Sequence, residues 1–339
     1  MTLKTEVAQS TINWYRIPIS RALAADLNQR SDVGGFVQTL GHLGIICVTA
    51  VLSWYASLHS SWPILIACLF LHGTVYAFLL NAFHEFCHGT VFKTRLLNRF
   101  FLYLISFLGG LNHVYFWDSH QEHHKYTLHQ PDDLEVILPF EITLKSLLTT
   151  SFVNPLGFIE RTRGWLMLSI GYLENDWQRR LFPDNKLDRR HELFTWARVL
   201  VAGHSAIVLT GWYTGHWMLP VLITFAPFYG GLLLFLCNNT QHVGLQDEVS
   251  DYRLCTRTIY LNPVVEFLYW HMNFHIEHHM HAAVPCYKLA RLHRVIKHEL
   301  PYITSGLVET WSVIIAIIRR QNIDPTYQFV PNLPPSMEG

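Results

Sequence analysis

Two long stretches of the chain contain no charged residue. From Val33 to Phe83, and again from Val199 to Gln246, there is no Asp, Glu, Lys or Arg. A membrane-spanning helix needs about 20 predominantly apolar residues, so each stretch can hold two helices and a short turn. A helical hairpin buried in a soluble core is the alternative. Helices of soluble proteins normally keep a polar face, however, and these show no charge on any face.

The pattern predicts four transmembrane helices in two hairpins, at about 36–58, 63–83, 194–213 and 217–238. The segments HSSWP (59–63) and YTGHW (213–217) are expected to form the two turns. Neither turn contains Lys or Arg, whereas the connection 84–193 and both tails are rich in them. By the positive-inside rule, the termini and the long connection then lie in the cytoplasm.

The remaining segments, 84–193 and 239–339, are expected to be cytosolic or interfacial. The run RFFLYLISFLGGLNHVYF (99–116) has no internal charge, so we expect a helix that lies in or dips into the membrane interface. The runs LKSLLTTSF and GWLMLSIGYL suggest further interfacial cover. No repeat or low-complexity linker is visible, so the sequence predicts one domain over 1–339. The expected fold is an all-α membrane protein with four transmembrane helices, interfacial helices and a cytosolic histidine-rich cap.

The composition narrows the function classes. The formal net charge is zero, so there is no basic surface for nucleic acid. The six cysteines form no C-x-x-C pair and are interpreted as reduced and structural. The N-terminal MTLKTEVAQS lacks the apolar core of a signal peptide. We therefore expect an integral protein of the bacterial inner membrane, or of the endoplasmic reticulum if the source is eukaryotic. The unusual figure is the 21 histidines.

Eight of these histidines fall into three clusters. HEFCH contains His84 and His88, HQEHH contains His120, His123 and His124, and HIEHH contains His275, His278 and His279. Positions i, i+3 and i+4 share one face of a helix, so each cluster presents its imidazoles in one direction. Because the chain returns to the same side after each predicted hairpin, all three clusters should meet at one membrane surface.

The number of histidines indicates two metal ions. HEFCH also satisfies H-E-x-x-H, by which zinc hydrolases hold their metal, and an intramembrane zinc hydrolase is one hypothesis. Eight imidazoles are too many for a single catalytic zinc, which takes three protein ligands and a water. Imidazole itself suits Zn, Cu, Fe and Ni alike. A substrate drawn from lipid offers unactivated C–H bonds, whose oxidation needs a redox metal and O₂, and this favours two irons.

The three clusters resemble the histidine boxes of the membrane-bound fatty acid desaturase and hydroxylase superfamily, in order and in spacing. The similarity to bacterial-type members extends from about Tyr15, in YRIPI, to about His293, in YKLARLH. The resemblance implies four membrane helices, a cytosolic cap and a dinuclear iron centre. It also implies a ninth ligand, since LCNNTQHVG supplies an N-x-x-x-H pattern after the fourth predicted span. In that pattern His242 would bind metal and Asn238 would hold a metal-bound water.

Several carboxylates could orient the metal-bound imidazoles through their distal N–H groups. Glu85 is the favoured candidate because it lies inside the first box. Glu122 could do the same, or could instead start its helix in a capping box with Ser119. Further candidates, each with a surface role as the equal alternative, are Asp118, Asp132, Asp133, Glu266 and, inside the third box, Glu277. His113, His129 and His281 fall outside the box pattern and are not assigned as ligands.

The expected activity is O₂-dependent insertion of a double bond into a fatty acyl chain by a diiron oxidoreductase. The alternative is a diiron hydroxylase or monooxygenase that acts on a lipid, a hydrocarbon or a small amphipathic metabolite. The chain has no G-x-G-x-x-G fingerprint, no cysteine set for an iron–sulfur cluster and no H-P-G-G haem motif. Electrons are therefore expected from a separate ferredoxin or cytochrome with its reductase, which would dock on the cytoplasmic face.

Overall fold

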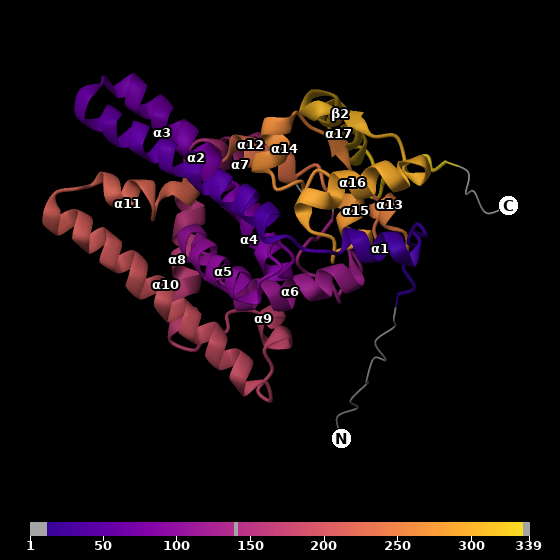
Figure 1. Ribbon diagram of the computed structural model, residues 1–339, viewed down its shortest axis with the longest axis horizontal. Coiled ribbons are helices and arrows are strands. Elements are labelled where there is room, and N and C mark those ends of the chain that lie inside the picture. The colour runs from indigo at the N-terminus through magenta and orange to yellow at the C-terminus, as the bar shows by residue number, and fades with distance from the viewer. Residues whose placement is uncertain (1–11, 139–141, 335–339) are drawn as a thin grey trace.

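The first uncharged stretch forms a long helical hairpin. The computed structural model describes residues 12–138 and 142–334, and the N-terminal ten residues, predicted to carry no signal peptide, lie outside them. Helix α2 spans Asp32–His59, and α3 (Trp62–Ala77) continues with little interruption into α4 (Leu79–His88). Ser31 caps α2 by accepting a hydrogen bond from the Gly34 N–H. Both α2 and the 62–88 run are long and apolar enough to cross a membrane. The two helices of the first predicted hairpin, and the turn between them, are therefore confirmed (Figure 1).

The second uncharged stretch begins as predicted and ends differently. Helix α10 (Leu187–Thr214) is a third candidate span and ends at Gly215, which has a φ of 76°. The prediction of one helix over 217–238 is wrong. This segment contains α11 (Met218–Leu222), the 3₁₀ turn η1 (Ala226–Phe228) and α12 (Leu232–Asn238). Pro227 cannot donate a backbone hydrogen bond, and Gly230 has a φ of 69°, so the helix cannot continue through them.

The break in this segment allows the backbone to cross α3 at very short range. A Cβ atom placed on Gly73 would lie 2.2 Å from the Tyr229 carbonyl oxygen, and one on Gly230 would lie 2.5 Å from the Phe70 carbonyl oxygen. The Thr74 hydroxyl donates to the Gly230 carbonyl at 2.9 Å. The interrupted helix is therefore held against α3 by backbone contact that requires glycine on both sides.

The predicted interfacial helix is two helices. Helix α5 (Arg95–Gly109) and helix α6 (His113–Tyr126) meet at an angle of 102° across a break at Gly110, whose φ is 61°. The pair is apolar enough to count together as a broken span or a re-entrant loop, so the described residues contain three candidate spans, or four with this pair. The prediction of a single helix over 99–116 is corrected because Gly110 ends α5 in a left-handed conformation.

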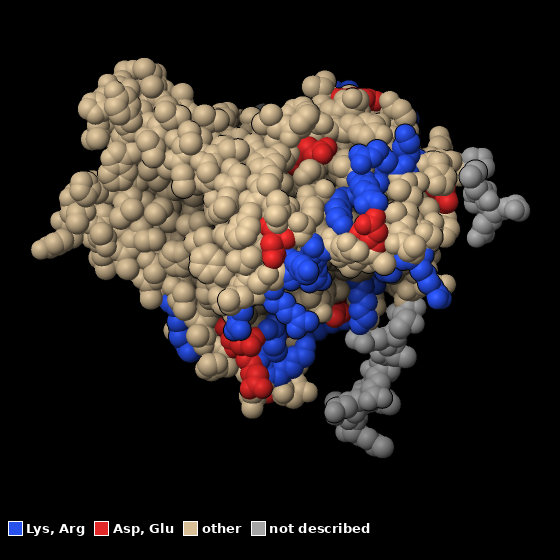
Figure 2. Space-filling model, in the orientation of Figure 1, with Lys and Arg blue, Asp and Glu red and all other residues tan. Residues whose placement is uncertain are grey.

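The other elements surround these long helices. They are α1 (Arg21–Leu27), α7 (Leu144–Ser151), α8 (Pro155–Ser169), α9 (Asp176–Leu181), α13 (Tyr252–Cys255), α14 (Pro263–Leu268), α15 (His275–Met280), α16 (Cys286–Ile296), η2 (Lys297–Glu299) and α17 (Gly306–Gln321). Two short strands, β1 (Ile259–Tyr260) and β2 (Thr304–Ser305), pair in parallel. On the face shown in Figure 2, charged side chains gather over one half of the molecule, and the end formed by the α2–α3 hairpin and α11 shows none.

The buried histidines of the long helices have hydrogen-bond partners in other segments. His72 contacts Thr49 Oγ1 and the Leu222 carbonyl, and His204 contacts Thr224 Oγ1 and the Phe107 carbonyl. The Trp270 indole N–H donates to His42 Nδ1 at 3.0 Å. Interhelical hydrogen bonds of this kind hold membrane helices together, so these histidines act in packing.

Candidate metal centre

Four separate elements supply the predicted ligands. Helix α4 carries the first box at its C-terminal end, α6 carries the second, the turn after α12 carries His242, and α15 carries the third box. Each box is helical, so histidines three and four residues apart point from one face. The structure brings together all nine histidines that the sequence singles out. They form two groups.

The first group contains five histidines. Ligand nitrogens of His84, His88, His120, His124 and His278 lie within 4.8 Å of one another. The Nε2 atoms face one another in pairs: His120 and His88 are 3.2 Å apart, and so are His278 and His124. Three elements that are distant in the chain, α4, α6 and α15, therefore aim imidazole nitrogens at one point.

The second group contains four histidines. Nitrogens of His123, His242 and His279 lie within 4.8 Å of one another. His275 joins them, because its Nε2 is 3.0 Å from His242 Nε2 and 3.1 Å from His279 Nε2. His123 and His124 are adjacent on α6 and belong to different groups, as do His278 and His279 on α15. The two groups are therefore direct neighbours.

Hydrogen bonds fix which nitrogen is protonated in the second group. His123 Nδ1 lies 2.8 Å from the Asp133 carboxylate, and His242 Nδ1 lies 2.8 Å from the Cys255 carbonyl. Both oxygens can only accept, so Nδ1 carries the proton on each ring. Thr127 donates its hydroxyl hydrogen to the His123 carbonyl and is left to accept from His279 Nδ1 at 3.3 Å. The three Nε2 atoms therefore present lone pairs toward one another.

In the first group, carboxylates are the hydrogen-bond partners of the histidine Nδ1 atoms. His120 Nδ1 lies 2.7 Å from Glu135 Oε1, so the lone pair of His120 Nε2 faces His88. Glu85 Oε1 lies 3.1 Å from His84 Nδ1 and 3.8 Å from His278 Nδ1. Glu85 is 1% exposed, so the first group contains a buried carboxylate beside two of its histidines.

Burial and neighbouring charges shift the pKa values of the histidines and of the acids beside them. Burial, together with the charges of neighbouring imidazoles, holds the pKa values of His275, His278 and His279 well below their ordinary value. Burial alone would raise the pKa of Asp133, but His123 and three hydrogen bonds hold it below its ordinary value. Burial raises the pKa of Glu135 to about 7. Rings whose pKa values are lowered stay neutral, which is the protonation state that metal binding requires, whereas Asp133 raises the pKa of His123 against the effect of burial.

This donor set fits metal ions. Converging lone pairs at about 3 Å repel one another, and a bound cation removes that repulsion. Imidazole nitrogen is a good ligand for Fe, Zn, Cu and Ni. Each group offers more imidazoles than the three of a catalytic zinc site, so the H-E-x-x-H match of HEFCH accounts for only part of the first group.

The structure separates the carboxylate candidates. Among the carboxylates predicted to orient imidazoles, Asp133 contacts the box histidine His123, and Glu85 contacts the box histidines His84 and His278. The others have different partners: Asp118 binds Arg189, Asp132 binds Arg180, Glu266 binds His271, and Glu277 binds His293 and Thr258. Ser119 lies inside α6, which Asn112 caps, so the proposed capping box of Ser119 and Glu122 is wrong.

Glu135 was not among the carboxylates predicted to orient the imidazoles. It lies 15 positions from His120 and in no recognised motif. The one available signal is its place in the acidic run Asp132-Asp133-Leu134-Glu135 directly after the second box. Carboxylate–histidine–metal arrangements are common, so an acidic run beside a histidine box deserves the same scrutiny as an acid inside it.

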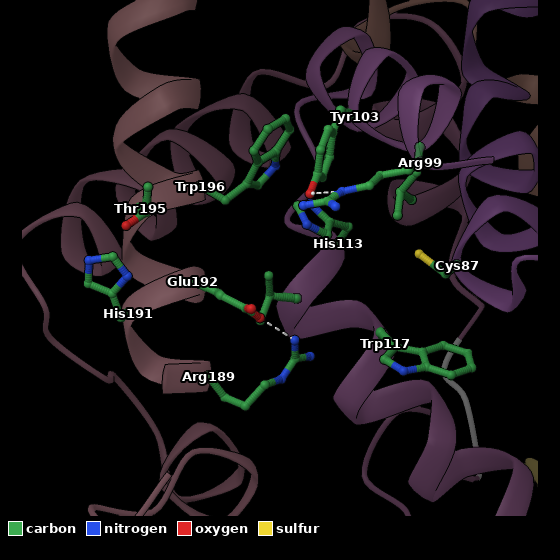
Figure 3. A pocket seen from close by; sticks show the side chains of 12 residues that line it. Cys87, Arg99, Tyr103, His113, Trp117, Arg189, His191, Glu192, Thr195 and Trp196 are labelled. Atoms are coloured by element: carbon green, nitrogen blue, oxygen red, sulfur yellow. Dashed lines mark hydrogen bonds and ion pairs between the residues drawn. The ribbon is translucent and has the colours of Figure 1, made fainter. Parts of the chain in front are cut away.

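One cavity borders the centre, and a second lies beside the first box. The larger, about 550 Å³, lies between α5, α6 and α10 and reaches Cys87, the neighbour of His88 (Figure 3). His113, which was not assigned as a ligand, is outside both groups, and it lines this cavity and packs against the rings of Trp196 and Tyr103. The other, about 410 Å³, is lined by His242, Glu135 and Asn238. His129 and His281 are outside both groups.

Comparison with known proteins agrees with these observations. A model of the fatty acid desaturase family matches residues 60–311, which include all three boxes. The chain is also 22% identical over 267 residues to the Delta(6)-fatty-acid desaturase fat-3 of Caenorhabditis elegans. That match covers 68% of this chain and 58% of the relative, so the chain spans a little over half the length of that protein.

Proposed function

The chain belongs to the fatty acid desaturase family, and from this membership and its histidine geometry we propose that it is a diiron, O₂-dependent membrane oxidoreductase that introduces a double bond into a fatty acyl chain. The observation that carries the proposal is the convergence of nine imidazoles in two adjacent groups, in which hydrogen bonds to Nδ1 orient the rings of His120, His123 and His242. Two bound iron ions would supply the redox chemistry that activates O₂ and oxidises an unactivated C–H bond.

The residues of the chain would divide the task as follows. His84, His88, His120, His124 and His278 would hold one ion, and His123, His242, His275 and His279 the other. Asp133, Glu135 and the Cys255 carbonyl would fix the orientation of the rings and the side on which each carries its proton. Asn238 lines the cavity beside His242 and would hold a water there, as the family resemblance implies.

The overall reaction balances with an external reductant. Two hydrogen atoms leave adjacent methylenes of the acyl chain, and a one-electron donor supplies two electrons while solvent supplies two protons. These reduce O₂ to two water molecules. We propose a separate ferredoxin or cytochrome as the donor, and an integral membrane location with the termini and the centre on the cytoplasmic side. The acyl substrate would come from the membrane.

A hydroxylase is the second candidate, because the same centre could return one oxygen atom to the substrate carbon. The deciding experiment is expression in a host of known lipid composition, with and without added iron, followed by mass spectrometry of the lipids. An iron-dependent product that lacks two hydrogens supports the desaturase, and one that gains an oxygen atom supports the hydroxylase. Purified protein that holds one zinc and no iron would contradict both and favour the zinc hydrolase.

A further inference from the structure

A cavity lies beside α3 and α4, next to the one that His242 lines. It has a volume of about 260 Å³ and is lined by residues of α3, α4, α8 and α12, including Tyr76, Asn154 and Arg161. Asn238 and Asn239 line both this cavity and the one that His242 and Glu135 border. The two cavities therefore share these amides, and the cavity that contains Arg161 is the neighbour of the one that contains His242.

Arg161 is a mostly buried cation, and no carboxylate of the described residues balances its charge. Its guanidinium donates to the Gly109 carbonyl at 2.9 Å and lies 4.9 Å from the ring centre of Phe228. Among residues 12–138 and 142–334, no carboxylate lies within ion-pair distance of it. Arg163, two residues further along α8, differs in both respects because it pairs with Glu174 at 2.9 Å and its side chain is 69% exposed.

Arg189, one of the two arginines that line the larger cavity, is also paired. In Figure 3, Arg189 points toward Glu192, and it also binds Asp118 at 2.5 Å. The other arginine of that cavity, Arg99, donates to the Tyr103 hydroxyl at 3.1 Å. The cavity at Arg161 contains no carboxylate among its lining residues, and Asn154 and Asn239 add amide groups that can donate hydrogen bonds.

A buried cation without a partner is costly, and within a membrane protein it marks a binding site. The Gly109 carbonyl ends α5 and offers only the partial negative charge of a helix C-terminus. A guanidinium has five N–H donors in a planar fork that matches a carboxylate, and the Gly109 bond uses one nitrogen. The cavity is therefore complementary to a small anion.

We propose that Arg161 binds the anionic group of an amphipathic substrate, a carboxylate in the first place, and thereby sets which carbon reaches the metal centre. The inference rests on the proposed function. Tyr76 lines the same cavity and precedes His84 by eight residues, so this wall of the cavity lies on the order of 12 Å along the helix from the first box. The far end of the substrate chain would lie against Leu134, Val136 and Leu138, which line the cavity beside His242.

Binding without turnover tests this proposal. Purified protein with its native metal content, reconstituted in nanodiscs, is given radiolabelled dodecanoate under anaerobic conditions, and unlabelled dodecanoate, dodecyl phosphate and dodecanol compete for the site. Empty nanodiscs give the background. We expect dodecanoate to compete about tenfold better than dodecanol, since charge-assisted hydrogen bonds are roughly twice as strong as neutral ones. Dodecyl phosphate competing better than dodecanoate would identify a phosphate as the preferred anion at the same site.

The variants separate anion binding from a purely structural role. Arg161→Gln should remove the preference for the anion and leave dodecanol competition unchanged, whereas Arg163→Gln should behave as the wild type. Arg161→Lys keeps the charge without the planar fork, so it should retain part of the preference even if Arg161→Gln does not fold. Equal competition by all three compounds in the wild type, or an unchanged preference in Arg161→Gln, would overturn the proposal.

The result is independent of the oxidation itself. If the anion preference depends on Arg161 but no lipid is oxidised in the expression experiment, the proposed function fails and the anion site stands. If lipids are oxidised but the preference is absent, the reverse holds.

Discussion

Asp133 fixes His123 from a fully buried position. One carboxylate oxygen accepts from His123 Nδ1 and from the Leu128 N–H, both at 2.8 Å, and the other accepts from the Glu135 N–H at 2.9 Å. These hydrogen bonds hold the Asp133 carboxylate in one position, and the carboxylate in turn holds the His123 ring in one orientation. His123 in turn belongs to the group of His242 and His279.

Replacement of Asp133 by Asn should weaken metal binding more than it weakens the fold. The amide cannot balance charge at His123, and loss of such an outer carboxylate typically costs about 10–100-fold in metal affinity. The measurement is iron retained by purified protein during dialysis against increasing chelator. Asp132→Asn is the matched control, because Asp132 pairs with Arg180 at the surface. Equal iron retention in both variants would show that Asp133 has no role in metal binding.

His242 is the proposed ligand that lies outside the three boxes. His242→Ala should abolish oxidation and lower the iron content to roughly half, because only the second group loses a donor. Metal analysis and membrane-fraction yield check this together. His129→Ala is the control, since His129 Nδ1 contacts only the Tyr126 and Thr127 carbonyls. A fully active His242→Ala would remove the ninth ligand from the proposal.

Glu277 lies inside the third box but serves the fold. It accepts from His293 at 2.5 Å and from the Thr258 hydroxyl at 2.5 Å, and the second nitrogen of His293 faces the Tyr260 hydroxyl at 3.0 Å. Glu277→Ala leaves the buried His293 without its hydrogen-bond acceptor, which should cost about 1–3 kcal/mol.

Thermal unfolding of Glu277→Ala should therefore shift to lower temperature, while the protein that remains folded keeps its iron stoichiometry. Glu266→Ala, whose side chain is 21% exposed beside His271, should shift the unfolding temperature less. Loss of iron from folded Glu277→Ala would return Glu277 to the metal centre.

The local patterns of the sequence were sufficient for the box histidines and for three of the long helices. Both depend on short-range rules, since helical spacing decides which imidazoles share a face and an uncharged run decides what can cross a membrane. The partition into two groups could not be predicted, because adjacent residues such as His123 and His124 point to different groups only once α6 is placed against α4 and α15.

The broken segment 217–238 shows a different limit. Its hydrophobicity is that of a span, but its path is set by contact of Gly230 with α3, a neighbour almost 160 residues earlier in the chain. Glu135 was missed for the same reason, since its role depends on the turn that folds it back onto His120. Both the path of this segment and the role of Glu135 depend on tertiary contacts, which cannot be predicted from local composition.

The contact at Gly73 gives a test of that packing. Gly73→Ala places a methyl group against the Tyr229 carbonyl, and overpacking of this kind costs about 1–3 kcal/mol. We expect a lower unfolding temperature in detergent. Gly44→Ala, on α2 with nothing within 4 Å of the added carbon, should be neutral or stabilising because alanine favours helix. Equal stability of the two variants would contradict the close crossing of α3 by the 229–231 segment.

Glu85 decides what the H-E-x-x-H match means. In a zinc hydrolase this glutamate is the general base, so its replacement abolishes turnover while the metal stays bound. Here Glu85 lies between Nδ1 of His84 and Nδ1 of His278, where a carboxylate orients ligands. Glu85→Gln should therefore reduce both iron occupancy and activity in parallel and only in part, as measured by metal analysis and product formation on the same preparation. Complete loss of activity with full metal content would restore the role of general base.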